Sequence, residues 1–158
     1  MVLSAGLYGL GLNKTASARG PVMATLIIDF GTNVPSVLAG NIVTWNETNG
    51  HWHYRATPSS DSIYMFMNVT AHQSNVWSLM LASAAIMNLT TGSSLKISKE
   101  YFSSYGDYYI TGIEGVQETS TLFWQYLVNG QPALYGVLQQ KIADGYVIEW
   151  QFLPSQGA

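Results

Sequence analysis

The stretch of residues 108–152 decides the fold of this chain. It contains Tyr108-Tyr109-Ile110-Thr111-Gly112-Ile113-Glu114-Gly115-Val116, then Phe123-Trp124-Gln125-Tyr126-Leu127-Val128-Asn129-Gly130, and then Asp144-Gly145-Tyr146-Val147-Ile148-Glu149-Trp150. The β-branched and aromatic residues of these runs favour strands. Asn-Gly and Asp-Gly accept the positive φ angles of tight hairpin turns, so both dipeptides predict turns between or beside strands.

The sequence before this stretch predicts further strands and one helix. The expected strands are residues 22–30, 41–45, 50–55, 63–69, 95–97 and 108–113. Residues 63–69 are almost continuously apolar, which predicts a strand buried on both faces. Asn75 is a suitable N-cap for a helix over residues 76–87, and this helix has almost no polar face, so we expect it to lie buried against the sheet.

These elements resemble the C-terminal domain of transcobalamin and intrinsic factor, and a related domain of unknown function on many prokaryotic, often archaeal, surface proteins. The resemblance covers residues 25–31 and 74–152. It implies a mainly β, α+β fold: a β-grasp-like sheet packed on one helix. Some members bind a corrinoid, which makes a small ligand one expectation. The positions that carry the resemblance form turns and strands, so they imply no reaction.

Composition limits the possible functions. The chain has 158 residues, 9% charged side chains and 13% aromatic side chains, against about 25% charged residues in an average soluble domain. So few charges and so many aromatic residues exclude intrinsic disorder. Six Lys plus Arg at a net charge of −3 exclude a nucleic-acid partner, because phosphate binding needs clustered cations. Another subunit or a glycan coat is expected to cover this surface.

Four Asn-X-Thr sequons occur in the chain, and they predict N-linked glycans on an extracellular, cell-surface protein. The acceptor residues are Asn13, Asn46, Asn68 and Asn88. The absence of cysteine excludes disulfides, thiolate nucleophiles and cysteine-based zinc sites.

The first twelve residues form an uncharged apolar segment that ends in a polar linker. Ala16-Ser17-Ala18 is similar to a signal-peptide cleavage site, but no basic residues precede the apolar run. A bilayer span needs about twenty apolar residues, and Gly6, Gly9 and Gly11 disfavour a helix. These properties predict an extended strand.

Such a strand has two possible positions. It either pairs with its own sheet or inserts into a neighbouring subunit as a donor strand, as in donor-strand complementation. The flexible linker ending in Gly20-Pro21 favours the second, so we assign residues 1–21 to an N-terminal arm and residues 22–158 to one domain. The arm residues expected at the subunit joint are Leu3, Leu7, Leu10 and Leu12.

The sequence offers little chemistry. His51 and His53 lie two residues apart and His72 is a third imidazole, but hydrogen-bonding surface roles are commoner than metal binding for such residues. No Gly-X-Ser-X-Gly motif is present. Carboxylates such as Glu114 and Glu149 fall in expected strands, with solvent-facing or cross-strand roles. We therefore predict no catalytic residues, no metal and no cofactor.

Aromatic residues are denser in the second half of the chain than one small core requires. The set is Tyr101, Phe102, Tyr105, Tyr108, Tyr109, Trp124, Tyr126, Tyr135, Tyr146 and Trp150. Those outside the core are expected to form a ligand platform or a subunit interface. Two hypotheses follow: a structural subunit of an extracellular, pilus-like filament, archaeal by its resemblance, or a surface module that binds a small corrinoid-like molecule or a carbohydrate.

Overall fold

The computed structural model describes residues 20–155, and the predictions for the arm, including those for Asn13 and the four leucines, lie outside these residues. The described part is built mainly of strands. Its elements are β1 (Val22–Gly31), β2 (Asn41–Thr48), β3 (His51–Pro58), β4 (Ser62–Ala71), α1 (Val76–Thr91), β5 (Ile97–Phe102), β6 (Asp107–Ile113), β7 (Val116–Gln117), β8 (Leu122–Val128), β9 (Gln131–Pro132) and β10 (Val147–Pro154).

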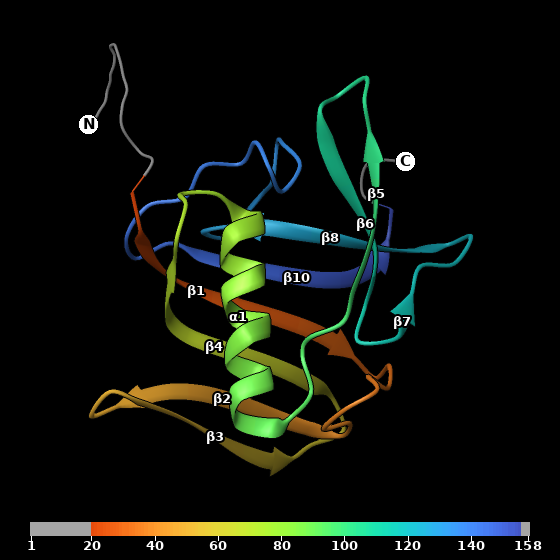
Figure 1. Ribbon diagram of the computed structural model, residues 1–158. Coiled ribbons are helices and arrows are strands. Elements are labelled where there is room, and N and C mark those ends of the chain that lie inside the picture. Colours follow the sequence, from red (N-terminus) through yellow and green to blue (C-terminus); the bar gives the residue numbers. More distant parts are fainter. Residues whose placement is uncertain (1–19, 156–158) are drawn as a thin grey trace.

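A mixed seven-stranded sheet forms the centre of the domain, with strand order β3-β2-β4-β1-β10-β8-β9. The central strand β1 pairs antiparallel with β4 and parallel with β10. Helix α1 crosses one face of this sheet (Figure 1). The predicted fold class, a mainly β, β-grasp-like sheet with one helix, is confirmed. No helix within residues 20–155 has the length and apolar character that crossing a bilayer requires.

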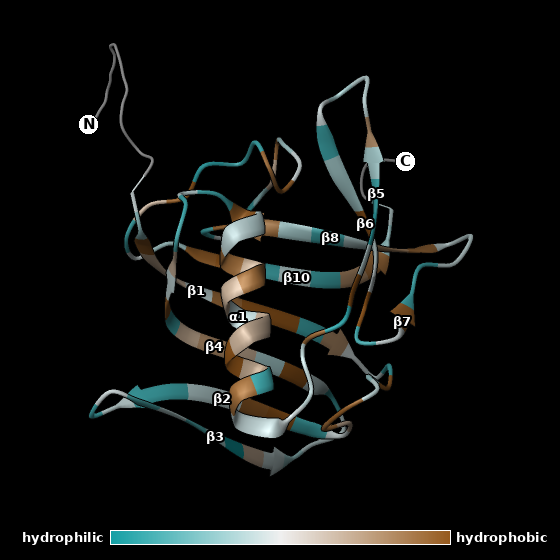
Figure 2. Cartoon of the chain, in the orientation of Figure 1, coloured by the Kyte–Doolittle hydropathy of each residue, from teal (hydrophilic) through white to brown (hydrophobic). Residues whose placement is uncertain are grey.

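The main core lies between the sheet and α1. Alternate residues of β1 point toward the helix, and Leu26, Ile28 and Phe30 are fully buried there. Figure 2 shows this apolar character along β1. The prediction that residues 63–69 are buried on both faces is wrong: Tyr64 and Phe66 are buried, whereas the alternate residues are half-exposed, because no described helix covers the second face.

Helix α1 begins where the sequence predicts and ends one turn later. Asn75 accepts a hydrogen bond from the Ser78 N–H at 2.8 Å, which confirms the N-cap. Gly92, with a φ of 83°, ends the helix in the left-handed conformation. The helix packs on the sheet through one face only: Leu81 and Leu89 are exposed. The expectation of a fully buried helix is therefore wrong, because its outer face is uncovered within the described residues.

Two Asn-Gly dipeptides form the turns of hairpins. Asn49-Gly50 joins β2 to β3, and Asn129-Gly130 joins β8 to β9, with positive φ angles at all four residues. Asp144-Gly145 instead lies in a turn that leads into β10. The Asp144 side chain accepts a hydrogen bond from the Met23 N–H, so this turn fixes the start of β10 beside the start of β1.

Strands β5, β6 and β7 form a separate three-stranded sheet. The expected strand over residues 95–97 begins only at Ile97 and runs to Phe102, because it pairs along β6 in a long hairpin. This hairpin rises beside the large sheet, near β8 (Figure 1). Its position next to β8 creates the cleft described below.

Candidate functional site

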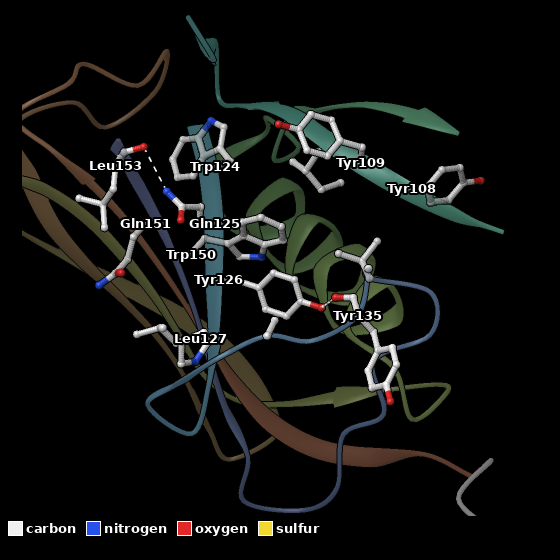
Figure 3. A pocket seen from close by; sticks show the side chains of 15 residues that line it. Tyr108, Tyr109, Trp124, Gln125, Tyr126, Leu127, Tyr135, Trp150, Gln151 and Leu153 are labelled. Carbon is white, nitrogen blue, oxygen red and sulfur yellow. Dashed lines mark hydrogen bonds between the residues drawn. The ribbon is translucent and has the colours of Figure 1, made fainter. Parts of the chain in front are cut away.

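A cleft of about 530 Å³ lies between the β5–β6 hairpin, β8, β10 and the loop after β9. This volume falls within the range typical of small-ligand sites. Figure 3 shows the side chains that line it. They are Tyr108, Tyr109, Ile110, Trp124, Gln125, Tyr126, Leu127, Pro132, Ala133, Tyr135, Gly136, Val137, Trp150, Gln151 and Leu153. None of these side chains carries a charge.

The cleft follows an edge of β8 that is open around Trp124. β9 pairs only with Leu127 and Val128 of β8. Farther along this edge, the Tyr126 carbonyl accepts from the Ala133 N–H and the Leu122 carbonyl accepts from the Thr119 N–H. Each residue of a strand directs its N–H and its carbonyl to one edge, and successive residues use opposite edges. Trp124 lies two residues from both Leu122 and Tyr126, so its N–H and carbonyl are directed to the same edge as theirs. No described strand pairs with Trp124 on that side.

Aromatic side chains of β8 and β10 form the inner wall of the cleft. The Tyr126 and Trp150 rings lie 4.6 Å apart, and the Trp124 and Phe152 rings lie 4.9 Å apart. The Trp124 Nε1–H donates to the Val116 carbonyl at 2.8 Å. The Trp150 Nε1–H is buried and has no acceptor among the described residues. This wall therefore holds one buried indole donor without a described partner.

The loop after β9 is fixed against the β5–β6 hairpin by Asp107. This buried carboxylate accepts hydrogen bonds from the Leu138 N–H at 2.8 Å and the Gln139 N–H at 3.2 Å. The Tyr126 hydroxyl donates to the Tyr135 carbonyl in the same loop (Figure 3). Burial, with a smaller contribution from the Asp107 charge, raises the pKa of Tyr126. The phenol therefore remains a neutral donor that holds this wall in place.

Polar groups in the cleft are few and belong mainly to amides. Gln125 donates through its Nε2 to the carbonyls of Leu153 and Pro154. The Tyr109 hydroxyl donates to Glu118, and burial together with this contact raises the pKa of Tyr109 to about 12. An apolar cleft with amide and backbone groups can bind an aromatic or extended apolar molecule.

Exposed apolar side chains surround the mouth of the cleft. Tyr105 is 75% exposed and Leu134 is 83% exposed. Tyr101, Phe102 and Tyr135 are also exposed at the tip of the β5–β6 hairpin or in the loop beside it. Large apolar side chains that gather at one place on a surface are typical of an interaction site. The aromatic set of the sequence thus divides into core residues, cleft residues and an exposed rim.

The described sequon residues lie on the surface. Asn46 on β2, Asn68 on β4 and Asn88 on α1 are all exposed. Their positions on three separate elements leave each one accessible, and glycan attachment at these sites stays a prediction. Thr90 of the Asn88 sequon has a structural role of its own, because its Oγ1 accepts a hydrogen bond from the Trp45 Nε1–H at 2.9 Å.

The histidines and acidic residues do not converge on a site. His51 and His53 lie on one face of β3, and no group of three His, Asp or Glu side chains within residues 20–155 is placed to hold a metal ion. The sequence predicted that Glu114 lies in a strand, with a solvent-facing or cross-strand role, but it lies in the turn between β6 and β7. It is fully buried and accepts hydrogen bonds from Ser36 and from the Lys96 N–H.

Sequence reasoning missed the part of the cleft that is not aromatic. Gln125, Leu127, Ala133 and Leu153 line the cleft but belong to no recognisable motif. One signal was available: Pro132 follows the Asn129-Gly130 turn, and proline in a strand marks a sheet edge. The edge of β8 is open where the loop after β9 turns away from it. The path of this loop depends on its contacts with Asp107, which is distant in sequence.

Comparisons with known proteins gave a match to a family model and matches to solved structures. A family model described as a domain of unknown function, DUF4430, matches residues 90–153, from the end of α1 through most of β10. This segment includes all three quoted runs. A crystal structure of haptocorrin in complex with Cbi is similar over 91% of this chain, with 16% identity and a TM-score of 0.48. The chain spans 28% of that haptocorrin chain. No curated protein matched the sequence.

Proposed function

We propose that this chain is the structural subunit of an extracellular, N-glycosylated, pilus-like filament on an archaeal cell surface. In this proposal, copies join head to tail through their N-terminal arms, which act as donor strands. The filament is a homopolymer whose partners are further copies and the attached glycans. The subunit has no catalytic task, no cofactor and no nucleic-acid partner.

The observation that supports this function best is the exposed apolar rim beside an open sheet edge. An isolated domain with only 9% charged residues and with Tyr105 and Leu134 exposed has poor solubility. Burial of this rim against another copy removes the apolar area from water, and an unpaired strand edge is a template for a strand from a second chain. Three exposed sequon residues on other elements can carry glycans that keep the polymer soluble.

Electron microscopy of the purified protein tests this proposal. The intact chain should form filaments of regular width. A variant with Tyr105→Ser, Leu134→Ser and Tyr135→Ser should lose them while its circular dichroism spectrum stays that of the folded protein. A matched control, Leu81→Ser with Leu89→Ser, removes exposed apolar side chains from α1 and should still assemble. An intact chain that stays monomeric at all concentrations would contradict the proposal.

The cleft itself supports a second candidate, a module that binds a small corrinoid-like molecule or a carbohydrate. Its volume of about 530 Å³ and its aromatic walls are features of small-ligand sites. Titration with a corrinoid should then quench the tryptophan fluorescence of Trp124 and Trp150 to saturation. An unchanged signal with corrinoids and with simple sugars would remove this candidate.

A further inference from the structure

We infer that the cleft along β8 is the acceptor groove for residues 2–12 of a second copy of this chain, which add a strand to the open edge at Trp124. This inference rests on the proposed filament function and names the surface that receives the arm.

The backbone of β8 offers hydrogen bonds at a defined place. Bonds from Thr119 and Ala133 close the edge at Leu122 and Tyr126, and Trp124 lies between them with its N–H and carbonyl directed outward. A strand that crosses this window can pair with Trp124, as in other cases of strand addition. The window is short, so most of the binding free energy must come from side chains in the cleft.

The chemistry of the arm matches the chemistry of the cleft. Residues 1–12 contain no charged side chain, and none of the side chains that line the cleft is charged. Insertion therefore buries no unpaired charge, which would carry a large desolvation penalty.

The cleft also accommodates the leucine pattern of the arm. Side chains of a strand alternate between two faces, so Leu3 and Leu7 share one face, while Leu10 and Leu12 share the other. The cleft extends around the edge of β8, with Trp124 on its inner side and Leu127 on its outer side. Both sets of leucines therefore meet an apolar wall, which a pocket on one face of the sheet would not provide.

The exposed rim favours an arm from another copy over the chain's own arm. A strand inserted from the same chain would fill the cleft but would leave Tyr105, Leu134 and Tyr135 in water. When the arm comes from a second copy, the body of that copy follows the arm through a short linker. It can then cover the rim around the cleft mouth.

Disulfide trapping between two full-length variants tests the inference, since the chain has no cysteine of its own. One variant carries Leu7→Cys in the arm, and the other carries Ala133→Cys at the cleft and a mass tag. Oxidation of the mixture should give a heterodimer on a non-reducing gel. The matched control pairs Leu7→Cys with Leu89→Cys, which places the second thiol on the exposed face of α1 and should give no such band.

Two outcomes would overturn the inference. One is equal cross-linking to Ala133→Cys and Leu89→Cys. The other is exclusively intramolecular cross-linking in a chain that carries both Leu7→Cys and Ala133→Cys. This result would mean that the arm occupies the cleft of its own chain.

A cleft-filling variant separates this inference from the filament proposal. Ala133→Trp should abolish filaments with an unchanged circular dichroism spectrum, whereas Leu89→Trp, at an exposed position on α1 away from the cleft and its rim, should not. If Ala133→Trp assembles normally, the groove assignment is wrong and the filament proposal stands. If the intact chain does not assemble but cross-links only to Ala133→Cys, the groove stands and the filament proposal falls.

Discussion

At the scale of single residues, buried carboxylates and hydroxyls connect segments that are distant in sequence. Glu114 joins the turn between β6 and β7 to Ser36 and to the backbone of Lys96. Thr90 at the end of α1 accepts from the Trp45 indole. Each of these groups has partners that satisfy it, so their roles are structural, and none of them takes part in the cleft.

Asp107 has the clearest single-residue effect on the cleft. Asp107→Ala leaves the Leu138 and Gln139 N–H groups without their acceptor. We expect a loss of about 3 kcal/mol in the free energy of unfolding, because hydrogen bonds to a charged acceptor are among the stronger ones. Urea unfolding followed by tryptophan fluorescence measures this loss. Asp107→Asn keeps one acceptor oxygen and should lose clearly less, and an equal loss in both variants would contradict this role.

At the scale of secondary-structure elements, the helix N-cap gives a direct test. Asn75→Ala removes the bond to the Ser78 N–H and should lower the free energy of unfolding by about 1 kcal/mol. Asn75→Ser supplies another capping oxygen and should restore most of this stability. A serine variant no more stable than the alanine variant in urea unfolding would show that the cap contributes nothing.

The two faces of α1 should respond differently to a charge. Leu89 is 73% exposed, so Leu89→Lys should change the free energy of unfolding by no more than about 0.5 kcal/mol. Leu79 is fully buried, and Leu79→Lys should destabilise the domain by about 4 kcal/mol or more, because the ammonium loses its hydration. Thermal melting of both variants measures the difference. A strongly destabilised Leu89→Lys variant would mean that something covers this face.

The elements that the sequence predicts well are those with strong local signals. Residues 22–30 became β1 with one added residue, and the capped start of α1 is at Val76, as expected. Local sequence signals gave wrong predictions of burial where the burial of a residue depends on segments that are distant in sequence. The apolar run around Met65 has an open second face, and Glu114 is buried because Ser36 and Lys96 reach it from other segments. The cleft depends on local sequence signals and also on contacts between distant segments. The sequence therefore predicted its aromatic residues but not its shape.

At the scale of the whole molecule, several tyrosines link stability to high pH. Burial raises the pKa of Tyr64, Tyr109 and Tyr126 above the ordinary value of about 10, and that of Tyr109 reaches about 12. The unfolded chain therefore loses these protons more readily than the folded chain. Stability from this source is fully present below pH 10 and falls as the pH rises from 10 toward 12.

Thermal melting between pH 8 and 12 measures this dependence. Tyr109→Phe should show a smaller decrease above pH 10 than the parent chain, whereas Tyr105→Phe, at an exposed position, should follow the parent. Identical curves for the parent and Tyr109→Phe would show that this phenol does not contribute.

The parallel pairing of β1 with β10 has a consequence for how the chain acquires its structure. Residues 25–29 of the first strand pair with residues 147–151 of the last, so the centre of the sheet is incomplete until almost the whole chain is available. Contacts between the two ends of a sequence form slowly, because a long loop must close first. During synthesis the central sheet therefore cannot be completed until this last strand is free.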